Sequence, residues 1–239
     1  MKWLRTLVLF DSGAILASPD WQQFHDSYVR AIGGVVYPPG AKDLTLRRKM
    51  RNPRDSSQWL RTGVKPLRQQ FLENMVTHEK WQAEGTVNLN RDRAQPPIRL
   101  YPSGQDYREP ITSDFGGFDF VTTGPAGTKI AIEWETGNIS SSHRSMNKLS
   151  LALGNGIIEV GVLIVPSRDL YEHLTDRIGN IGELSGYLSM WEGLTASVSR
   201  GLLAITVVEH DRLSDDPALP FLSVGVDGRS RQRTIRRPR

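Results

Sequence analysis

Three acidic side chains in one stretch of the sequence have the types and the spacing to hold a metal ion. Thirteen residues separate Asp119 from Glu133, and Glu135 follows two positions later. Three carboxylates held close together repel one another, so they must be protonated, solvated or neutralised by a cation. Mg²⁺ suits such a site because it takes oxygen ligands and is commonly held by one or two carboxylates and several waters. There it would polarise a phosphoryl oxygen and lower the pKa of a bound water.

Two other interpretations of these acids stay open from the pattern alone. One is a strand whose acidic face is simply solvated. The other is glycoside hydrolysis, in which two carboxyl groups flank a sugar bond. The neighbouring sequence does not present the aromatic platform expected of a sugar site.

A β-hairpin is predicted to bring the three acids together. Residues 118–121 are β-prone, residues 124–127 (Gly-Pro-Ala-Gly) have turn chemistry, and residues 129–135 again favour a strand. Because side chains alternate along a strand, Glu133 and Glu135 should point to the same side. Asp119 should then lie on the partner strand, roughly opposite both glutamates.

A helix is predicted directly after the acids, over residues 140–153, and Gly154 is expected to end it. Its first turn would offer backbone N–H groups and a positive dipole end to a phosphate. Asn138, Ser140 and Arg144 are side chains that can read base edges. The plainer alternatives are helix capping for the serines and a solvated charge for Arg144.

The run EWETGNISSSHRSMNKL, which starts at Glu133, resembles the active-site and recognition segment of the BamHI family of type II restriction endonucleases. That family is a divergent branch of the PD-(D/E)xK nuclease superfamily, whose usual signature ends in Glu-x-Lys. A glutamate replaces the lysine in the family, as Glu135 does here. The likeness continues without a shift in spacing to LTDR at residues 174–177.

The resemblance implies a fold, an activity and partners. The fold is α/β, with a central mixed β-sheet flanked by helices on both sides, in a single catalytic and DNA-binding domain over residues 1–228. The activity is Mg²⁺-dependent hydrolysis of phosphodiester bonds in double-stranded DNA at a palindromic six-base site, GGATCC, which leaves 5′-phosphate ends. The enzyme would be a homodimer in the cytoplasm of a bacterium or archaeon, with a cognate DNA methyltransferase in the same host and no membrane partner. The alternative is a related nuclease or a DNA-binding protein with a different recognition sequence.

The resemblance also assigns catalytic and metal-binding roles. Asp119 and Glu133 would bind Mg²⁺ with the backbone oxygen of Trp134, and Glu135 would orient or deprotonate the attacking water. Glu84, in the sequence WQAEG, matches a further catalytic and metal-binding acid, although little more than Trp81 supports that match.

For contact with DNA the resemblance selects six residues: Asn138, Ser140, Arg144, Asp176, Arg177 and Asp227. This set fits the half-site GGA. Arg144 and Arg177 could each fork onto a guanine, Asp176 could accept from a cytosine amino group, and Asn138 suits the inner A·T pair. The role of Asp176 and Arg177 comes from the resemblance alone, since the pattern around them otherwise indicates an ordinary charged helix end.

The composition is that of a globular chain with a basic end. Of 239 residues, 38% are hydrophobic and 23% are charged, which is enough to build one large core. The chain has no cysteine, so disulfides, thiolate zinc sites and cysteine nucleophiles are excluded. Residues 229–239 hold six arginines, without which the formal net charge of +4 becomes −2. We expect this tail to bind polyanions such as DNA.

The remaining pattern alternates between strands and helices, as in α/β domains. The apolar run after Met1 is too short for a signal peptide and is interpreted as structural. Helices are expected from Ser18-Pro19 onward, over residues 66–79, after Ser167 with Leu170, Leu174 and Ile178 on one face, and over residues 180–191. Strands are expected at 157–165 and 202–208.

Two further segments have no assigned role. Residues 47–54, RRKMRNPR, are strongly basic and are either a solvated loop or a phosphate contact. Residues 85–116 are long, polar and rich in proline, glycine and arginine. A connection of this length is uncommon in a compact domain unless it has a function, and it is either an extra DNA arm or a plain insertion.

Overall fold

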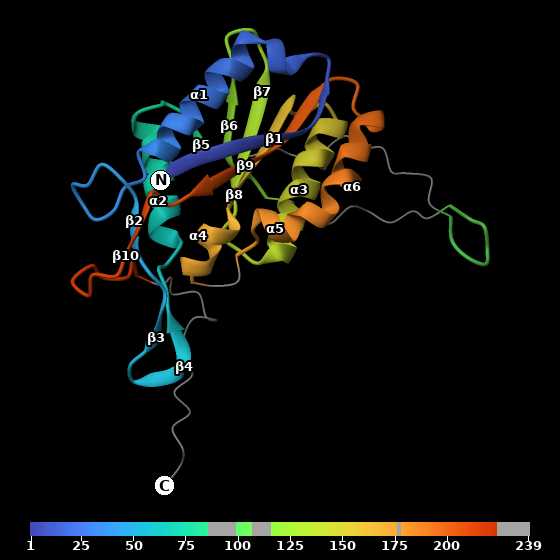
Figure 1. The fold of residues 1–239 in the computed structure, drawn as a ribbon. Helices are drawn as coiled ribbons and strands as arrows, with labels where there is room; N and C mark the ends of the chain where they lie inside the picture. The colour runs from blue at the N-terminus through green and yellow to red at the C-terminus, as the bar shows by residue number, and fades with distance from the viewer. Residues whose placement is uncertain (86–98, 107–115, 176–177, 224–239) are drawn as a thin grey trace.

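A six-stranded mixed sheet forms the centre of the protein (Figure 1). The computed structural model describes residues 1–85, 99–106, 116–175 and 178–223. The strands lie in the spatial order β1 (Lys2–Ser12), β9 (Gly201–Glu209), β8 (Val160–Pro166), β7 (Lys129–Trp134), β6 (Phe118–Thr123) and β5 (Ala83–Gly85). The three central strands are parallel, and antiparallel strands flank them on both sides. Every residue of β8 and β9 is buried, as expected of parallel strands covered on both faces.

Helices cover both faces of this sheet. The helices α1 (Pro19–Gly33) and α2 (Lys65–Thr77) share one hydrophobic cluster with Ile130 and Ile132 of β7. On the other face, α3 (Ile139–Gly154) and α6 (Leu188–Glu192) share a second cluster with Ala131. Alternate side chains of one strand therefore feed two cores. This arrangement confirms the predicted mixed sheet with helices on both sides.

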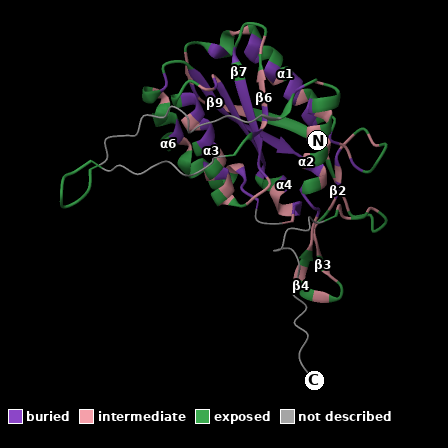
Figure 2. Ribbon diagram, turned by 180° about the vertical axis from the view of Figure 1, so that it is seen from behind, coloured by how far each residue is buried: buried purple, intermediate pink, exposed green. Residues whose placement is uncertain are grey.

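The smaller elements surround this frame. They are η1 (Ile15–Ala17), β2 (Thr45–Arg47), β3 (Met50–Asn52), β4 (Asp55–Leu60), α4 (Arg168–His173), α5 (Ile181–Leu184), η2 (Ser185–Tyr187), η3 (Gly193–Ser197) and β10 (Arg212–Ser214). The strands β2 and β10 pair in parallel, and β3 and β4 form a separate two-stranded sheet. Figure 2 shows the contrast between the buried central strands and the exposed or half-buried β3 and β4.

Three predicted helix boundaries were wrong. The helix after Ser167 ends at His173, and Leu174 and Ile178 lie in backbone bridges instead of on a helix face. The helix predicted over 180–191 is divided into α5, η2 and α6, and glycines at 182 and 186, which disfavour helix, lie in the interrupted region. Gly154 is the last residue of α3, so the cap is the following residue, Asn155.

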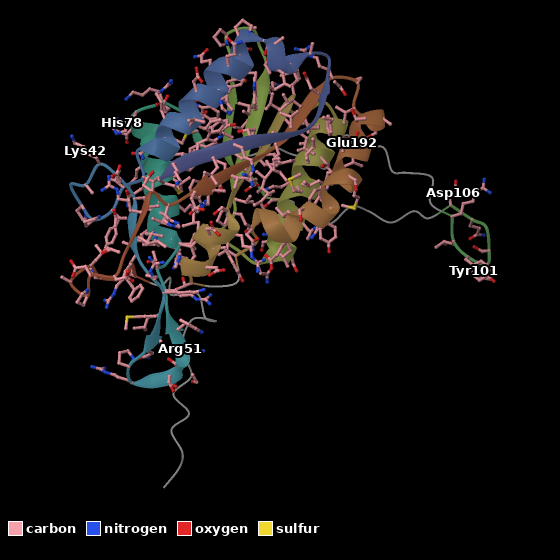
Figure 3. All side chains as sticks on the ribbon, in the orientation of Figure 1. Lys42, Arg51, His78, Tyr101, Asp106 and Glu192 are labelled. Atoms are coloured by element: carbon pink, nitrogen blue, oxygen red, sulfur yellow. The ribbon has the colours of Figure 1, made fainter. Side chains whose placement is uncertain are left out.

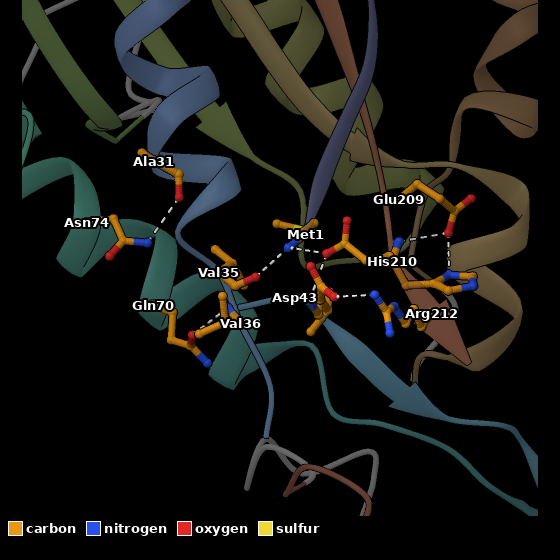
Figure 4. A network of polar contacts seen from close by, with 12 residues as sticks. Met1, Ala31, Val35, Val36, Asp43, Gln70, Asn74, Glu209, His210 and Arg212 are labelled. Atoms are coloured by element: carbon orange, nitrogen blue, oxygen red, sulfur yellow. Dashed lines mark hydrogen bonds and ion pairs between the residues drawn. The ribbon is translucent and has the colours of Figure 1, made fainter. Parts of the chain in front are cut away.

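The start of the chain packs into the body of the protein, as its interpretation as a structural strand requires. The Met1 ammonium group donates to the Val35 carbonyl at 2.5 Å and forms an ion pair with Asp211 at 2.8 Å. Figure 4 shows the polar network around it, in which Arg212 pairs with Asp43. Among the described helices, none is both long and apolar enough to cross a bilayer.

Candidate active site

The β6–β7 hairpin forms as predicted and places Asp119 opposite Glu133. Phe120 pairs with Ile132, so Asp119 and Glu133 are one step further along the two strands. The turn between the strands is fixed by the buried Asp20 at the start of α1, whose carboxylate accepts from Ala126 N at 3.1 Å and from Thr128 N at 3.2 Å. These hydrogen bonds lower the pKa of Asp20 against the effect of burial. The hairpin is therefore attached to the first helix layer.

Asp119 is held by two groups. Its Oδ2 accepts a hydrogen bond of 2.8 Å from the backbone N–H of Trp134, and its Oδ1 pairs with the Arg68 guanidinium of α2. The N–H bond ties the carboxylate to the strand that carries Glu133. This hydrogen bond to a backbone group fixes the orientation of the Asp119 carboxylate and leaves its side chain little freedom to rotate.

Glu133 is buried, with 8% of its surface exposed, and it pairs with the buried Lys148 of α3. Burial raises the pKa of Glu133 to about 7; the Lys148 ammonium opposes that rise, while the charges of Asp119 and Glu135 add to it. Lys148 also donates to the Gly117 carbonyl at 2.8 Å. The two acids that influence Glu133 show that all three carboxylates belong to one electrostatic cluster.

Glu135 lies just beyond the end of β7 and is 4% exposed. Its Oε1 accepts from Gly137 N at 2.5 Å. Burial raises the pKa of Glu135, against the effect of the Ser142 hydroxyl, the nearby backbone N–H groups and the charge of Arg144. A carboxylate whose pKa is raised by burial is a stronger base than an exposed one.

Helix α3 begins at Ile139, four positions after Glu135, and its cap is Asn138. The Asn138 side-chain oxygen accepts from Ser140 N at 3.0 Å and Ser141 N at 3.3 Å. The N-cap is therefore Asn138, whereas helix capping was the alternative interpretation for the serines. Asn138, Ser140 and Arg144 are all exposed, and the spacing of Ser140 and Arg144 puts them on one face of the helix. These three predicted DNA-binding residues thus lie together at the start of α3.

Glu84 lies on the edge strand β5. Its neighbours Ala83 and Gly85 pair with Phe120 and Phe118, so Glu84 is across from Asp119 by register. The backbone therefore brings the fourth predicted acid to the same part of the sheet.

The predicted DNA-binding residues Asp176, Arg177 and Asp227 lie outside the described residues, as does the basic tail. The residues on both sides of 176–177 are placed, however. Ile178 bridges to Asn138, and Gly179 N donates to Gly137 O at 3.0 Å. Residues 178–179 thus lie against the start of α3.

Two cations of the site were not predicted from the sequence, Arg68 and Lys148. Arg68 is on a helix far from the hairpin in the sequence, and no local pattern connects it with Asp119. Lys148 offered one signal, because it lies next to the apolar stripe of α3 formed by Met146 and Leu149. A lysine at the margin of a buried helix face requires a partner.

The donor set is compatible with a hard divalent cation. Glu133 Oε1 is buried with no partner other than the Lys148 ammonium, and Glu135 Oε2 is buried without a well-formed hydrogen bond, although the Ser142 hydroxyl is near enough to lower the Glu135 pKa. Within the described residues, no three or more His, Cys, Asp and Glu side chains are gathered closely enough to hold a metal ion as they stand. Lys148 and Arg68 supply positive charge to this acid cluster.

The geometry agrees with the comparison of the chain with known proteins. A family model described as restriction endonuclease BamHI matches residues 1–229. The chain belongs to the BamHI family of restriction endonucleases. The type II restriction enzyme OkrAI of Oceanobacter kriegii is 32% identical to it over 231 residues, which cover 96% of this chain and 99% of OkrAI.

Two further relatives of this BamHI-family chain define what is shared. The type II restriction enzyme BamHI of Bacillus amyloliquefaciens is 48% identical over 174 residues, 72% of this chain and 70% of that enzyme. A crystal structure of the restriction endonuclease BglII with a DNA 16-mer aligns with a TM-score of 0.53 at 10% identity, over 88% of this chain and 79% of that one. The latter likeness concerns the fold alone. The family match makes this chain a type II site-specific deoxyribonuclease.

Proposed function

We propose that this BamHI-family enzyme is a Mg²⁺-dependent homodimer that cuts both strands of GGATCC and leaves 5′-phosphate ends. The observation that carries the proposal is the position of the acid cluster. The buried Glu133 and Glu135 lie within five residues of Asn138, at the exposed helix start that also bears Ser140 and Arg144. Asp119 is opposite Glu133 on the neighbouring strand. Hydrolytic and base-reading groups would then act on neighbouring parts of one duplex.

The metal-binding residues in this proposal are Asp119, Glu133, Glu84 and the Trp134 carbonyl oxygen. A bound Mg²⁺ would supply Lewis-acid polarisation of the phosphoryl oxygen and an acidified water. Lys148 pairs with Glu133. A bound cation would take over this compensation of charge, and the flexible Lys148 side chain can withdraw from the carboxylate without moving the sheet.

The proton acceptor in this proposal is Glu135. It would take the proton of the attacking water as the water oxygen bonds to phosphorus and the bond from phosphorus to the 3′-oxygen breaks. The products are a 5′-phosphate and a 3′-hydroxyl group. A raised pKa suits this task, because it makes the Glu135 carboxylate a better proton acceptor than an exposed glutamate.

Base recognition would follow the chemistry of the exposed groups. Arg144 and Arg177 would each fork onto a guanine, Asp176 would accept from a cytosine amino group, and Asn138 would bind the adenine of the inner pair. Asn138 uses its side-chain oxygen to cap α3, so its amide nitrogen is the group left to donate. Asp227 would contact DNA from the C-terminal segment.

The first experiment is digestion of a plasmid of known sequence with the purified protein in Mg²⁺, followed by sequencing of the cut ends. We expect cuts at GGATCC alone, with 5′-phosphate ends. Uniform cutting at a different six-base palindrome would replace the recognition sequence and keep the enzyme class. Cutting of random DNA would remove the proposed site specificity.

Binding and cleavage can be separated with Ca²⁺, which fills oxygen sites but activates water poorly. In Ca²⁺ we expect tight binding to a duplex with GGATCC, at least about 10³-fold tighter than to random DNA, without cutting. Equal affinity for both duplexes would reject the proposed reading of bases.

A palindromic recognition site implies two partners, a second copy of the chain and a DNA methyltransferase. Two-fold symmetry of the DNA is matched by a symmetric protein dimer, and light scattering in solution should give the mass of two chains. A methyltransferase of the same host would protect GGATCC, so premethylation of that site should prevent cutting. A monomeric mass at micromolar concentration, both free and on DNA, would overturn the homodimer.

A further inference from the structure

The β3–β4 hairpin stands away from the sheet. It is a two-stranded unit of its own, in which Met50 pairs with Leu60 and Arg51 with Trp59. None of the residues 47–61 is buried. Figure 1 shows the hairpin projecting from the end of the molecule near α4, and Figure 3 shows the Arg51 side chain on it. The hairpin therefore adds little to the hydrophobic core.

The cations of this hairpin are ordered. The Arg51 guanidinium lies over the exposed Trp59 ring at 4.1 Å from the ring centre, and the Lys49 ammonium lies at 5.7 Å from it. At the tip, Asp55 accepts from Ser57 N at 3.0 Å, and Asn52 accepts from Arg54 N at 3.0 Å. These local bonds fix the turn, so the tip arginine is presented by a defined backbone.

Three of the arginines keep their charge uncompensated. Lys49 pairs with Glu172 and Arg48 with Asp215. Over the described part of the chain, by contrast, no carboxylate pairs with Arg51, Arg54 or Arg61, and the buried Nε of Arg61 has no hydrogen-bond partner. Arg51 also donates to the Ser56 carbonyl at 3.2 Å. Guanidinium groups without an acidic partner fit an anionic ligand.

The base of the hairpin is joined to the DNA-reading edge of the protein. Thr62 N donates to His173 O at 2.8 Å, and Thr175 N donates to Thr62 O at 2.7 Å. Ile178, three positions after Thr175 in the sequence, bridges to Asn138. The base of the hairpin and the start of α3 are therefore held by residues only three positions apart in the sequence.

We propose that the β3–β4 hairpin is a DNA arm that contacts backbone phosphates outside the six-base recognition sequence. This inference rests on the proposed function. The six residues of β4 span about 20 Å at roughly 3.3 Å per residue, which equals about six base pairs along a strand at roughly 3.4 Å each. Arg51 and Arg54 bind phosphates, and Trp59 holds Arg51 in place. The ligand is duplex DNA, because the chain belongs to a family of DNA-cutting enzymes. Contacts to backbone phosphates carry no sequence information, so they can lie outside the recognition sequence.

The test compares binding of the full-length protein in Ca²⁺ to two duplexes with the same GGATCC site, one of about 10 base pairs and one of about 30, long enough to cover the reach estimated from the rise per residue. The variant is Arg51→Gln with Arg54→Gln. The matched control is Lys2→Gln with Lys42→Gln, which removes the same charge from exposed residues elsewhere; Lys42 is labelled in Figure 3. A charge-preserving variant, Arg51→Lys with Arg54→Lys, separates charge from fold.

We expect the hairpin variant to bind the long duplex about tenfold more weakly, with the salt slope reduced by about 1.8 for two lost phosphates. The short duplex and the control variant should change less than twofold, and the lysine variant should retain most of the affinity. The cut sequence should be unchanged.

Equal weakening on both duplexes, or no weakening on either, would overturn the DNA arm. A hairpin that binds another protein also gives no weakening. These outcomes are distinct from failure of the proposed function, because the parent protein would then fail to distinguish GGATCC from random DNA.

Discussion

The acid cluster and the β3–β4 hairpin both concentrate charge, but the protein treats that charge in opposite ways. Glu133 and Glu135 are buried, and the cluster is neutralised internally by Lys148 and Arg68. The hairpin arginines are exposed or half-buried and have no acidic partner among the described residues. Burial makes the protonation state of an acid depend on pH and on bound cations. The interactions of an exposed cation depend instead on the salt concentration. The two regions should therefore respond to different variables.

The largest effect is expected from Asp119→Asn. The amide retains an oxygen for the Trp134 N–H but loses the charge, so we expect cleavage in Mg²⁺ to fall roughly a thousandfold, since metal assistance is worth several kcal/mol. Binding to the specific duplex in Ca²⁺ should remain within about tenfold, or 1.4 kcal/mol. Single-turnover cleavage and a binding titration measure both. Turnover close to that of the parent would remove Asp119 from the metal site.

The next largest effect tests whether Lys148 compensates the charge of Glu133. Lys148→Met leaves Glu133 buried without its cation, which should destabilise the metal-free protein by about 3–5 kcal/mol. Mg²⁺ should then raise the melting temperature more in this variant than in the parent, because the ion replaces the lost charge. Thermal unfolding in EDTA and in Mg²⁺ measures the difference. Arg200→Met, which breaks an exposed pair with Glu159, is the control and should change little.

The pH dependence of stability should come from Glu133. Its pKa rises from 4.5 to about 7 on folding, so the folded protein favours the protonated acid, and stability is lost as pH rises through that range. At about 1.4 kcal/mol per unit, the loss is up to roughly 3 kcal/mol. In EDTA, Glu133→Gln should therefore gain stability relative to the parent between pH 5 and pH 8, because the amide does not titrate. A difference that is the same at both values would contradict the raised pKa.

The smallest expected effect distinguishes base recognition from sequence-independent contact with phosphates. Arg144→Ala should cost about 1–3 kcal/mol of discrimination at one guanine and leave binding to random DNA nearly unchanged. The hairpin variant should do the reverse, with equal weakening across sequences. Competition binding with single-base variants of GGATCC measures both. Uniform weakening by Arg144→Ala would mark Arg144 as a phosphate contact.

The elements that hold the candidate site could be predicted where the pattern is local. Alternation and turn chemistry gave the β6–β7 hairpin, and apolar spacing gave α3, so Asp119, Glu133 and the start of the helix were placed correctly relative to one another. The interrupted helix after Asn180 was missed because apolar spacing persists across it while glycines weaken the helix. The sequence also carries no local sign that α4 stops at His173, since backbone pairing of the next residue with a distant one ends it.

The compensating cations could not be predicted, for a physical reason. Arg68 and Lys148 come from helices on opposite faces of the sheet, α2 and α3. Each meets its acid only because of the way its helix packs on the sheet. Periodicity describes one element at a time, whereas charge compensation depends on how elements are stacked. The roles of individual site residues stay predictions.

The short link between Glu135 and the cap of α3 also has a consequence for enzyme engineering. Glu135 is bonded to the N–H of Gly137, and Asn138 follows immediately as the cap. A substitution that shifts Asn138 will also move the Glu135 carboxylate, the proton acceptor in the proposed function. Variants in this segment that recognise another DNA sequence should thus cut more slowly. A change of recognition sequence is better sought at residues outside the segment 135–138.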